Sequence, residues 1–275
     1  MGIEESGTKQ SRPGIYNVLK EIAVEVPVSE AYEEQMEVTR SVGIKNLAEH
    51  SIVLDETATT HDIVTNIAKI PSLKYAKSVV NLFASARFPE NTELIIDIPN
   101  CSNLDSMFAY AKYVSKVKIS GNVDGNLVVL DKSFVASAGN DGLTEIDFTD
   151  FVLRIGSMTT PFNSRTGLKK ILGEFDLSEC EETQSVMLGS NRLLEEIRFK
   201  ANTIKNKMIF SGCVNLSIES AKSILLGLVN LIGTEKEFTL SVGLSAITWE
   251  KLAADTTAPN NMTWADYIYS IGWNK

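Results

Sequence analysis

The clearest pattern along the chain is a short alternation of apolar and polar residues that ends in a cysteine. Each copy has the form apolar-x-apolar-x-x-Cys, in which x is any residue. Alternate residues of a strand point to the same side, so each copy predicts a short strand with two buried residues, followed by a turn. The three copies are Ile96, Ile98 and Cys101; Phe175, Leu177 and Cys180; and Met208, Phe210 and Cys213.

Four further copies end in asparagine or phenylalanine. Asn122 follows Val117 and Ile119, Phe151 follows Ile146 and Phe148, Asn191 follows Val186 and Leu188, and Asn202 follows Ile197 and Phe199. An asparagine amide can satisfy backbone groups buried between coils, and a small thiol fits the same position. We therefore predict a buried structural ladder made of Cys101, Asn122, Phe151, Cys180, Asn191, Asn202 and Cys213.

The spacing of the copies predicts a solenoid with two strands in each coil. Residues 180, 191, 202 and 213 are evenly spaced, and two of these intervals make one coil, as from Phe175 to Ile197 and from Val186 to Met208. Upstream, the pattern recurs at a longer interval, from Val117 to Ile146 and again from Ile146 to Phe175. The longer interval predicts insertions of about seven residues in loops that contain glycine, asparagine and proline.

Four of the copies also have an apolar residue three positions before their first apolar residue, which completes the pattern L-x-x-L-x-L-x-x-N/C: Val114, Leu143, Leu172 and Leu194. Over roughly residues 92–245 the chain resembles the BspA-like leucine-rich-repeat proteins. The stretch from Cys213 to Leu228, with Glu237 to Leu240, Lys251-Leu252 and Ile271 to Trp273, resembles the end of repeat proteins in phage and prophage tails and baseplates. The resemblance implies a virion component whose partners are other virion proteins or a host surface receptor, with a homo-oligomer possible.

These patterns predict an α+β fold with three parts. Residues 1–91 form a mixed α/β attachment or capping region, with a strand at 23–28 and helices at 30–40 and 61–86. Residues 92–245 form the irregular leucine-rich-repeat solenoid, in which Ser217 starts a helix and Phe238 and Leu240 lie in a last strand. Residues 246–275 form a C-terminal cap, and the large apolar residues expected to cover the final coil are Trp249, Leu252, Trp264, Ile268 and Trp273.

Charge and composition narrow the function. The 26 basic and 35 acidic residues give a formal charge of -9, so we expect no binding to a nucleic-acid backbone. No stretch approaches the ~20 apolar residues that span a bilayer, and no secretion signal precedes Pro13, which favours assembly in the host cytoplasm over insertion in a membrane. Three cysteines cannot form a disulfide framework.

The middle residue of each strand pattern is expected to point outward. These residues form a candidate interaction face: Asp97, Lys118, Asp147, Asp176 and Arg198. The face either binds a partner or consists of opposite charges, Asp97 with Lys118 and Asp176 with Arg198, that merely stabilise neighbouring strands by ~0.2–1 kcal/mol each. Both interpretations stay open at the level of sequence.

The sequence predicts no enzyme, cofactor or metal. Phosphate-binding, dinucleotide-binding, acyl-transfer and zinc-protease motifs are absent, and His50 and His61 lack ligands at metal-site spacing. Carboxylate pairs such as Asp147 and Asp150 leave a β-solenoid hydrolase open as a third class. The principal alternative to the virion component is an adhesion protein at the bacterial cell surface that binds host protein or glycan.

Overall fold

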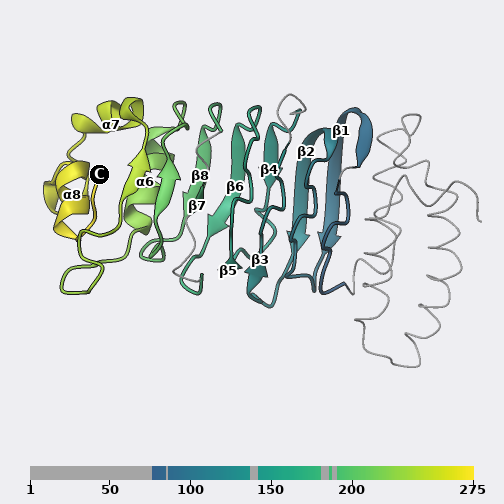
Figure 1. The fold of residues 1–275 in the computed structure, drawn as a ribbon, viewed down its shortest axis with the longest axis horizontal. Coiled ribbons are helices and arrows are strands. Elements are labelled where there is room, and N and C mark those ends of the chain that lie inside the picture. Colours follow the sequence, from purple (N-terminus) through teal and green to yellow (C-terminus); the bar gives the residue numbers. More distant parts are fainter. Residues whose placement is uncertain (1–75, 85, 137–141, 181–185, 188–190) are drawn as a thin grey trace, which may run out of the picture.

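The computed structural model describes residues 76–84, 86–136, 142–180, 186–187 and 191–275. In this part the chain winds into a β-solenoid of about 4 turns, with three α-helices near its C-terminal end (Figure 1). The strand predicted at 23–28 and the helix predicted at 30–40 lie outside the described residues. Among the described helices, none combines the length and hydrophobicity that crossing a bilayer requires.

The coils stack through three parallel sheets. The largest consists of β1 (Arg87–Ile98), β2 (Lys112–Gly121), β4 (Glu145–Asp147), β6 (Lys170–Phe175) and β8 (Glu196–Phe199), in that spatial order. β3 (Val128–Val129) pairs with β5 (Ile155–Ser157), and β9 (Met208–Phe210) lies between β7 (Val186–Met187) and β10 (Val242–Leu244). From β2 to β9, strands of the large sheet alternate along the chain with strands of the two smaller sheets, so these coils have the expected two strands each, whereas β1 and β2 follow one another in the large sheet.

Strand register confirms part of the predicted spacing and corrects the rest. Val186 pairs with Met208 and Val117 pairs with Ile146, as the shorter and the longer interval of the repeat predict. Phe175 pairs with Phe199 instead of Ile197, however, and Ile146 pairs with Ile171 instead of Phe175. The cause lies in β6, where the register shifts between Lys170 and Glu174 around Gly173, whose φ of 111° is left-handed.

A column of stacked phenylalanines fills one corner of the interior. The ring centroids of Phe83, Phe108, Phe134 and Phe162 are 5.1, 5.4 and 5.7 Å apart in succession. Two positions before each ring a left-handed residue turns the chain, with φ of 57° at 81, 55° at 106, 51° at 132 and 46° at 160. The stack repeats once per coil, like the strands.

The phenylalanine column shows that the solenoid starts earlier in the chain than predicted. Ala76 and Val79 are buried in the same core, and the Phe83 amide donates to the Met107 carbonyl of the next coil. Residues 76–84 and 86–91 therefore belong to the solenoid, so the predicted boundary at residue 91 is wrong. Residues 80–84 form turns, so the C-terminal part of the helix predicted at 61–86 is wrong as well. The apolar residues of this stretch, Leu82 and Phe83, are buried at a corner of the coil and not along one face of a helix.

The C-terminal end is helical, as predicted. α6 (Ile218–Gly227) begins after Ser217, whose hydroxyl accepts from the Ser220 amide. α7 (Ala246–Ala253), the 3-10 turn η3 (Pro259–Asn261) and α8 (Trp264–Ser270) follow. The five predicted covering residues are all buried, at 8% exposure or less: Trp249, Leu252, Trp264, Ile268 and Trp273.

The last strand lies later than predicted. Phe238 has a φ of 55° and sits in a turn, whereas the strand β10 begins at Val242. The amide of Val242 donates to the carbonyl of Asn274, so the chain end covers the outer edge of this strand. Phe238 instead stacks on Tyr269 at a centroid distance of 4.6 Å.

Candidate interaction face

The outward residues of the five-stranded sheet form what we call the outer face. Alternation along each strand separates them from the buried residues: in β1, Leu94 and Ile96 are buried while Glu93 and Ile95 are exposed. The outer face consists of Glu93, Ile95 and Asp97 from β1; Lys116, Lys118 and Ser120 from β2; Glu145 and Asp147 from β4; Lys170, Leu172 and Glu174 from β6; and Glu196 and Arg198 from β8.

The first row across the outer face alternates in charge at every strand. Register pairs join Glu93 to Lys116, Lys116 to Glu145, Glu145 to Lys170, and Lys170 to Glu196. Opposite charges on neighbouring strands attract one another, which favours this register over one shifted by a residue. Sequence reasoning missed this row because its members recur at unequal intervals along the chain and share no common motif.

The predicted interaction residues do not form a single row. Lys118 lies opposite Asp147, but it pairs with Ile95 on the other side, while Asp97 lies opposite Ser120 and accepts from its hydroxyl at 2.9 Å. The predicted pair of Asp97 with Lys118 is therefore wrong. So is Asp176 with Arg198: Arg198 lies opposite Glu174, and Asp176 lies beyond the end of β6.

Ion pairs on this face join nearest neighbours. Lys116 Nζ lies 3.1 Å from Glu93, and Lys118 Nζ lies 2.6 Å from Asp150 and 3.9 Å from Asp147. Lys118 donates to the Asp150 carboxylate, and this hydrogen bond and charge raise the pKa of Lys118. The side chains of Lys116 and Lys118 are 48% and 40% exposed, so solvent screens these pairs and each contributes little to stability.

Asp147 and Asp176 also shape the turns after their strands. The Asp147 carboxylate accepts from the Thr149 amide at 2.8 Å, and the Asp176 carboxylate accepts from the Ser178 amide at 3.0 Å. Partial burial of Asp176 disfavours its charge, but hydrogen bonds from Lys200 and Ser178 outweigh burial and lower the pKa of Asp176. Both predicted interaction residues thus have bonds within their own coils.

Most of the predicted ladder is buried, but in two columns instead of one. Cys101, Asn122, Phe151 and Cys180 follow strands of the five-stranded sheet, whereas Asn191 and Cys213 follow β7 and β9. Four members share one turn, in which their amide donates to the carbonyl three positions earlier, at 2.9–3.1 Å: Cys101, Phe151, Cys180 and Cys213. In these four copies the turn accounts for the three positions between the second apolar residue and the ladder residue.

The buried side chain of Asn122 bonds to backbone groups, as expected, but these belong to the exposed residues Asn126 and Val152. Its amide donates to the carbonyls of Asn126 at 2.9 Å and Val152 at 2.7 Å, and its side-chain oxygen accepts from the Asn126 amide. Asn202 differs: it is exposed, so its assignment to the buried ladder is wrong. Its coil is the last with a strand in the large sheet, and its backbone amide donates to Leu226 of α6.

The three cysteines, all among the described residues, form no disulfide and lie inside the protein. Each has 0% exposure, in agreement with the expected packing role. Burial raises the pKa of Cys213 to about 12, against the opposing effect of a hydrogen bond from the Asn191 backbone. A neutral thiol is a poor nucleophile and a poor metal ligand, so this site favours packing.

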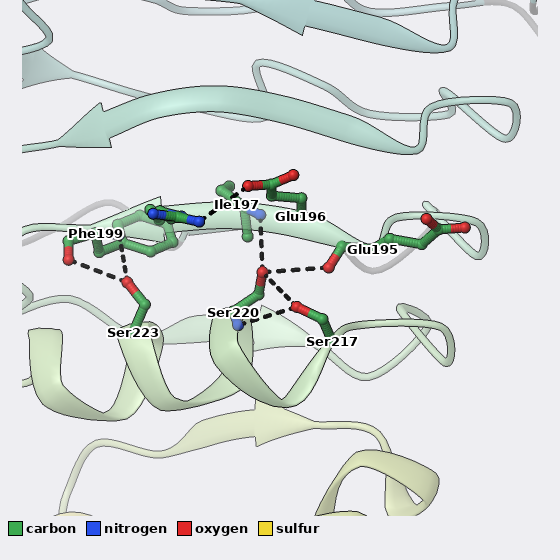
Figure 2. A network of polar contacts seen from close by, with 8 residues as sticks. Glu195, Glu196, Ile197, Phe199, Ser217, Ser220 and Ser223 are labelled. Atoms are coloured by element: carbon green, nitrogen blue, oxygen red, sulfur yellow. Dashed lines mark hydrogen bonds and ion pairs between the residues drawn. The ribbon is translucent and has the colours of Figure 1, made fainter. Parts of the chain in front are cut away.

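The helix α6 takes the place of the next strand at the edge of β8 (Figure 2). The Ser220 hydroxyl accepts from the Ile197 amide at 3.1 Å and donates to the Glu195 carbonyl. The Ser223 hydroxyl accepts from the Phe199 amide at 2.9 Å and donates to the carbonyl of the same residue. The two serines supply the donors and acceptors that a neighbouring strand would otherwise provide.

A second polar centre joins α6 to the C-terminal segment. The Asp255 carboxylate lies 2.5 Å from Lys222 Nζ and accepts from the Thr257 amide and hydroxyl and from the Trp264 indole. The hydrogen bond from Lys222, and then those from Thr257, hold the pKa of Asp255 well below its ordinary value. This carboxylate is thus fixed as an anion that connects two helices.

Nothing in the described ranges groups three or more histidine, cysteine or acidic side chains in a way that could hold a metal ion. What the outer face offers a partner is a fixed arrangement of charges and exposed apolar groups. The chain matches no protein-family model, no curated protein and no solved structure.

Proposed function

We propose that this protein is a non-catalytic assembly component that binds another protein through the outer face. We further propose that its repeats are leucine-rich repeats of the BspA type, and that it is part of a phage or prophage virion, in the tail, baseplate or host-recognition apparatus. The resemblance of the repeats and of the C-terminal segment supports the class of protein. The outer face supports the mode of action.

The alternating row from Glu93 to Glu196 carries this proposal. Five charges of alternating sign are held on strands ~4.8 Å apart, which presents a fixed pattern that a protein partner can complement. Ile95, which is 59% exposed beside this row, adds an apolar group to the same surface. Charge complementarity of this kind gives specificity and orientation more than raw affinity.

Polar side chains on and around the outer face already bond to other groups of the chain, which favours a binding role over catalysis. Lys118 bonds with Asp150, and the Asp147 and Asp176 carboxylates accept from backbone amides of their own turns. A general acid and base need accessible carboxylates directed at one substrate position. Side chains already engaged in building the coil are better suited to display a surface.

The proposal is tested on purified phage particles. Mass spectrometry of the particles, followed by antibody labelling in electron micrographs, should detect the protein at one fixed position. Detection on intact bacterial cells and not on particles would replace the virion component with the adhesion protein. Release of sugars from surface polysaccharide by the purified chain would contradict the non-catalytic role.

The outer face is tested separately from the location. In a phage carrying Lys116→Glu and Lys118→Glu, we expect incorporation into particles to fall, because two positive positions become negative. Lys207→Glu changes an exposed lysine next to β9, outside the outer face, and should leave incorporation unchanged. Equal incorporation of both variants would contradict a role for the outer face.

A further inference from the structure

The first row of the outer face is complementary to itself. Across β1, β2, β4 and β6 it reads Glu93, Lys116, Glu145 and Lys170, that is, negative, positive, negative, positive. Read from the other end, the same four positions are positive, negative, positive, negative. Each charge therefore meets its opposite when the row is placed against a reversed copy of itself.

The second row has the same property with different chemistry. It reads Ile95, Lys118, Asp147 and Leu172 across the same four strands. In the reversed reading the apolar ends exchange places, and the central cation and anion exchange places. When the strand order of a second copy is reversed, both rows are therefore complementary at once: apolar residues face apolar residues, and each charge faces an opposite charge.

A two-fold axis parallel to the strands, in the plane between two facing sheets, produces this reversal. It inverts the order of the strands and keeps each row opposite itself. We propose that a second copy of this chain binds face to face on the outer face, with β1 against the partner's β6 and β2 against the partner's β4. Glu93 then meets the partner's Lys170, Lys116 meets the partner's Glu145, and Ile95 meets the partner's Leu172.

This arrangement closes on itself as a dimer, because both copies use the same surface. Most of the charged groups involved are accessible: the side chains of Glu93, Lys116 and Lys118 are 59%, 48% and 40% exposed, while those of Asp147 and Leu172 are partly buried. The contact is short along the strands, because β4 ends at Asp147 and no register pair crosses it beyond the second row. A small, charged contact belongs to the weak and transient class of interfaces and weakens with added salt.

The inference rests on the proposed function, since it names the partner of the same surface. The experiment is sedimentation equilibrium of the full chain over a range of protein and salt concentrations. We expect a monomer–dimer equilibrium that shifts toward monomer as salt rises. Lys116→Glu places a negative charge against the partner's Glu145, and the two-fold axis repeats this contact, so the association constant should fall ~10-fold or more.

A variant in which two charges of the first row are exchanged distinguishes the effect of contacts between two copies from the effect of contacts within one copy. In the double variant Lys116→Glu with Glu145→Lys, the row reads negative, negative, positive, positive, which still complements its reversal. The alternation within one copy is lost in this variant. We expect association to return to within about 3-fold of the parent protein, while Lys207→Glu, with the same change in net charge as Lys116→Glu, should not alter it.

A chain that stays monomeric at every concentration would overturn the dimer. So would a dimer that Lys116→Glu leaves unchanged, or a double variant that associates as weakly as Lys116→Glu alone. Thermal unfolding of each variant verifies that it is folded before association is compared. Loss of particle incorporation by the outer-face variants in a chain that remains monomeric would refute the dimer and leave the proposed function standing.

Discussion

In the coils from β1 to β6, each strand finds its hydrogen-bond partners on the backbone of the next strand. β1 and β2 alone are joined by eight register pairs, and the Phe83 to Phe162 column repeats one ring in each coil. At the other end of the large sheet, β8 pairs with β6 on one side, and on its outer edge the amides of Ile197 and Phe199 donate to the hydroxyls of Ser220 and Ser223 on α6. Continuation of a solenoid thus needs repeated residues, whereas its termination needs particular polar side chains.

The difference reflects what the backbone can do unaided. A strand offers a regular row of donors and acceptors, which another strand matches without help from its side chains. Away from its ends a helix uses its backbone groups internally, so there it can satisfy a strand edge only through side chains. A helix that covers an edge in this way also prevents the addition of strands from other molecules.

The largest expected effect comes from interrupting the continuous region. Phe134→Ala removes a ring with 0% exposure that stacks on Phe108 and Phe162, so the free energy of unfolding should fall by about 3–5 kcal/mol. Chemical denaturation measures the change. Phe238→Ala, which removes a partly exposed ring from the C-terminal end, is the matched control and should cost clearly less. Equal losses would mean that the column has no special role.

Asn122 and Asn202 allow a direct comparison of the repeated coils with the edge next to α6. Each is the last residue of the repeat pattern, Asn122 after β2 and Asn202 after β8. Asn122 and Asn202 both have left-handed φ, 47° and 55°, so substitution by alanine strains both backbones alike. Asn122→Ala also removes three part-buried hydrogen bonds to the backbone of Asn126 and Val152, whereas the bond of Asn202 to Leu226 uses its backbone amide and is kept in Asn202→Ala. It should therefore destabilise the protein by about 1–3 kcal/mol more than Asn202→Ala in the same denaturation experiment.

A substitution at the edge of β8 that α6 covers should lower the free energy of unfolding by a smaller amount. Ser220→Ala removes the acceptor of the Ile197 amide and should lower the free energy of unfolding by about 1–2 kcal/mol. Hydrogen exchange of the Ile197 amide should quicken at the same time. Ser270→Ala, at an exposed helix end, is the control with little expected change. Unchanged exchange in Ser220→Ala would show that the serine does not protect this edge.

The smallest effect concerns acid stability of the C-terminal end. The pKa of Asp255 is lower in the folded protein than its ordinary value of 3.8, so its ionised form favours folding. This contribution is present above pH 3.8 and is lost as the pH falls through the folded pKa. Asp255→Asn should therefore flatten the decline of Tm with acid, and Lys222→Met should flatten it similarly. A decline identical to that of the parent protein would contradict the role of this ion pair.

How far the sequence predicted the fold depends on how local each signal was. The ladder turn is local, since the amide of Cys180 bonds only three positions back, and its pattern was found. The start of α6 at Ser217 is local as well. The phenylalanine column was missed because its rings, at positions 83, 108, 134 and 162, recur at unequal intervals set by the length of each coil.

The candidate site could be predicted only in part. Lys118 and Asp147 point outward as predicted, because their strands alternate, but that they lie opposite each other was not predicted. Asp176 and Arg198 were assigned to one row because the shorter interval of the repeat joins them, but the register shift around Gly173 places Arg198 opposite Glu174. A shift in one strand changes every pair beyond it.

The sequence by itself determined that apolar residues at alternate positions form short strands, that these strands repeat, and that a helix begins after Ser217. Those features follow from interactions among residues a few positions apart. Only the tertiary structure decided which charges face each other, because the length of each loop and the bulge in β6 set the register between coils. The alternating row on the outer face exists only once that register is fixed.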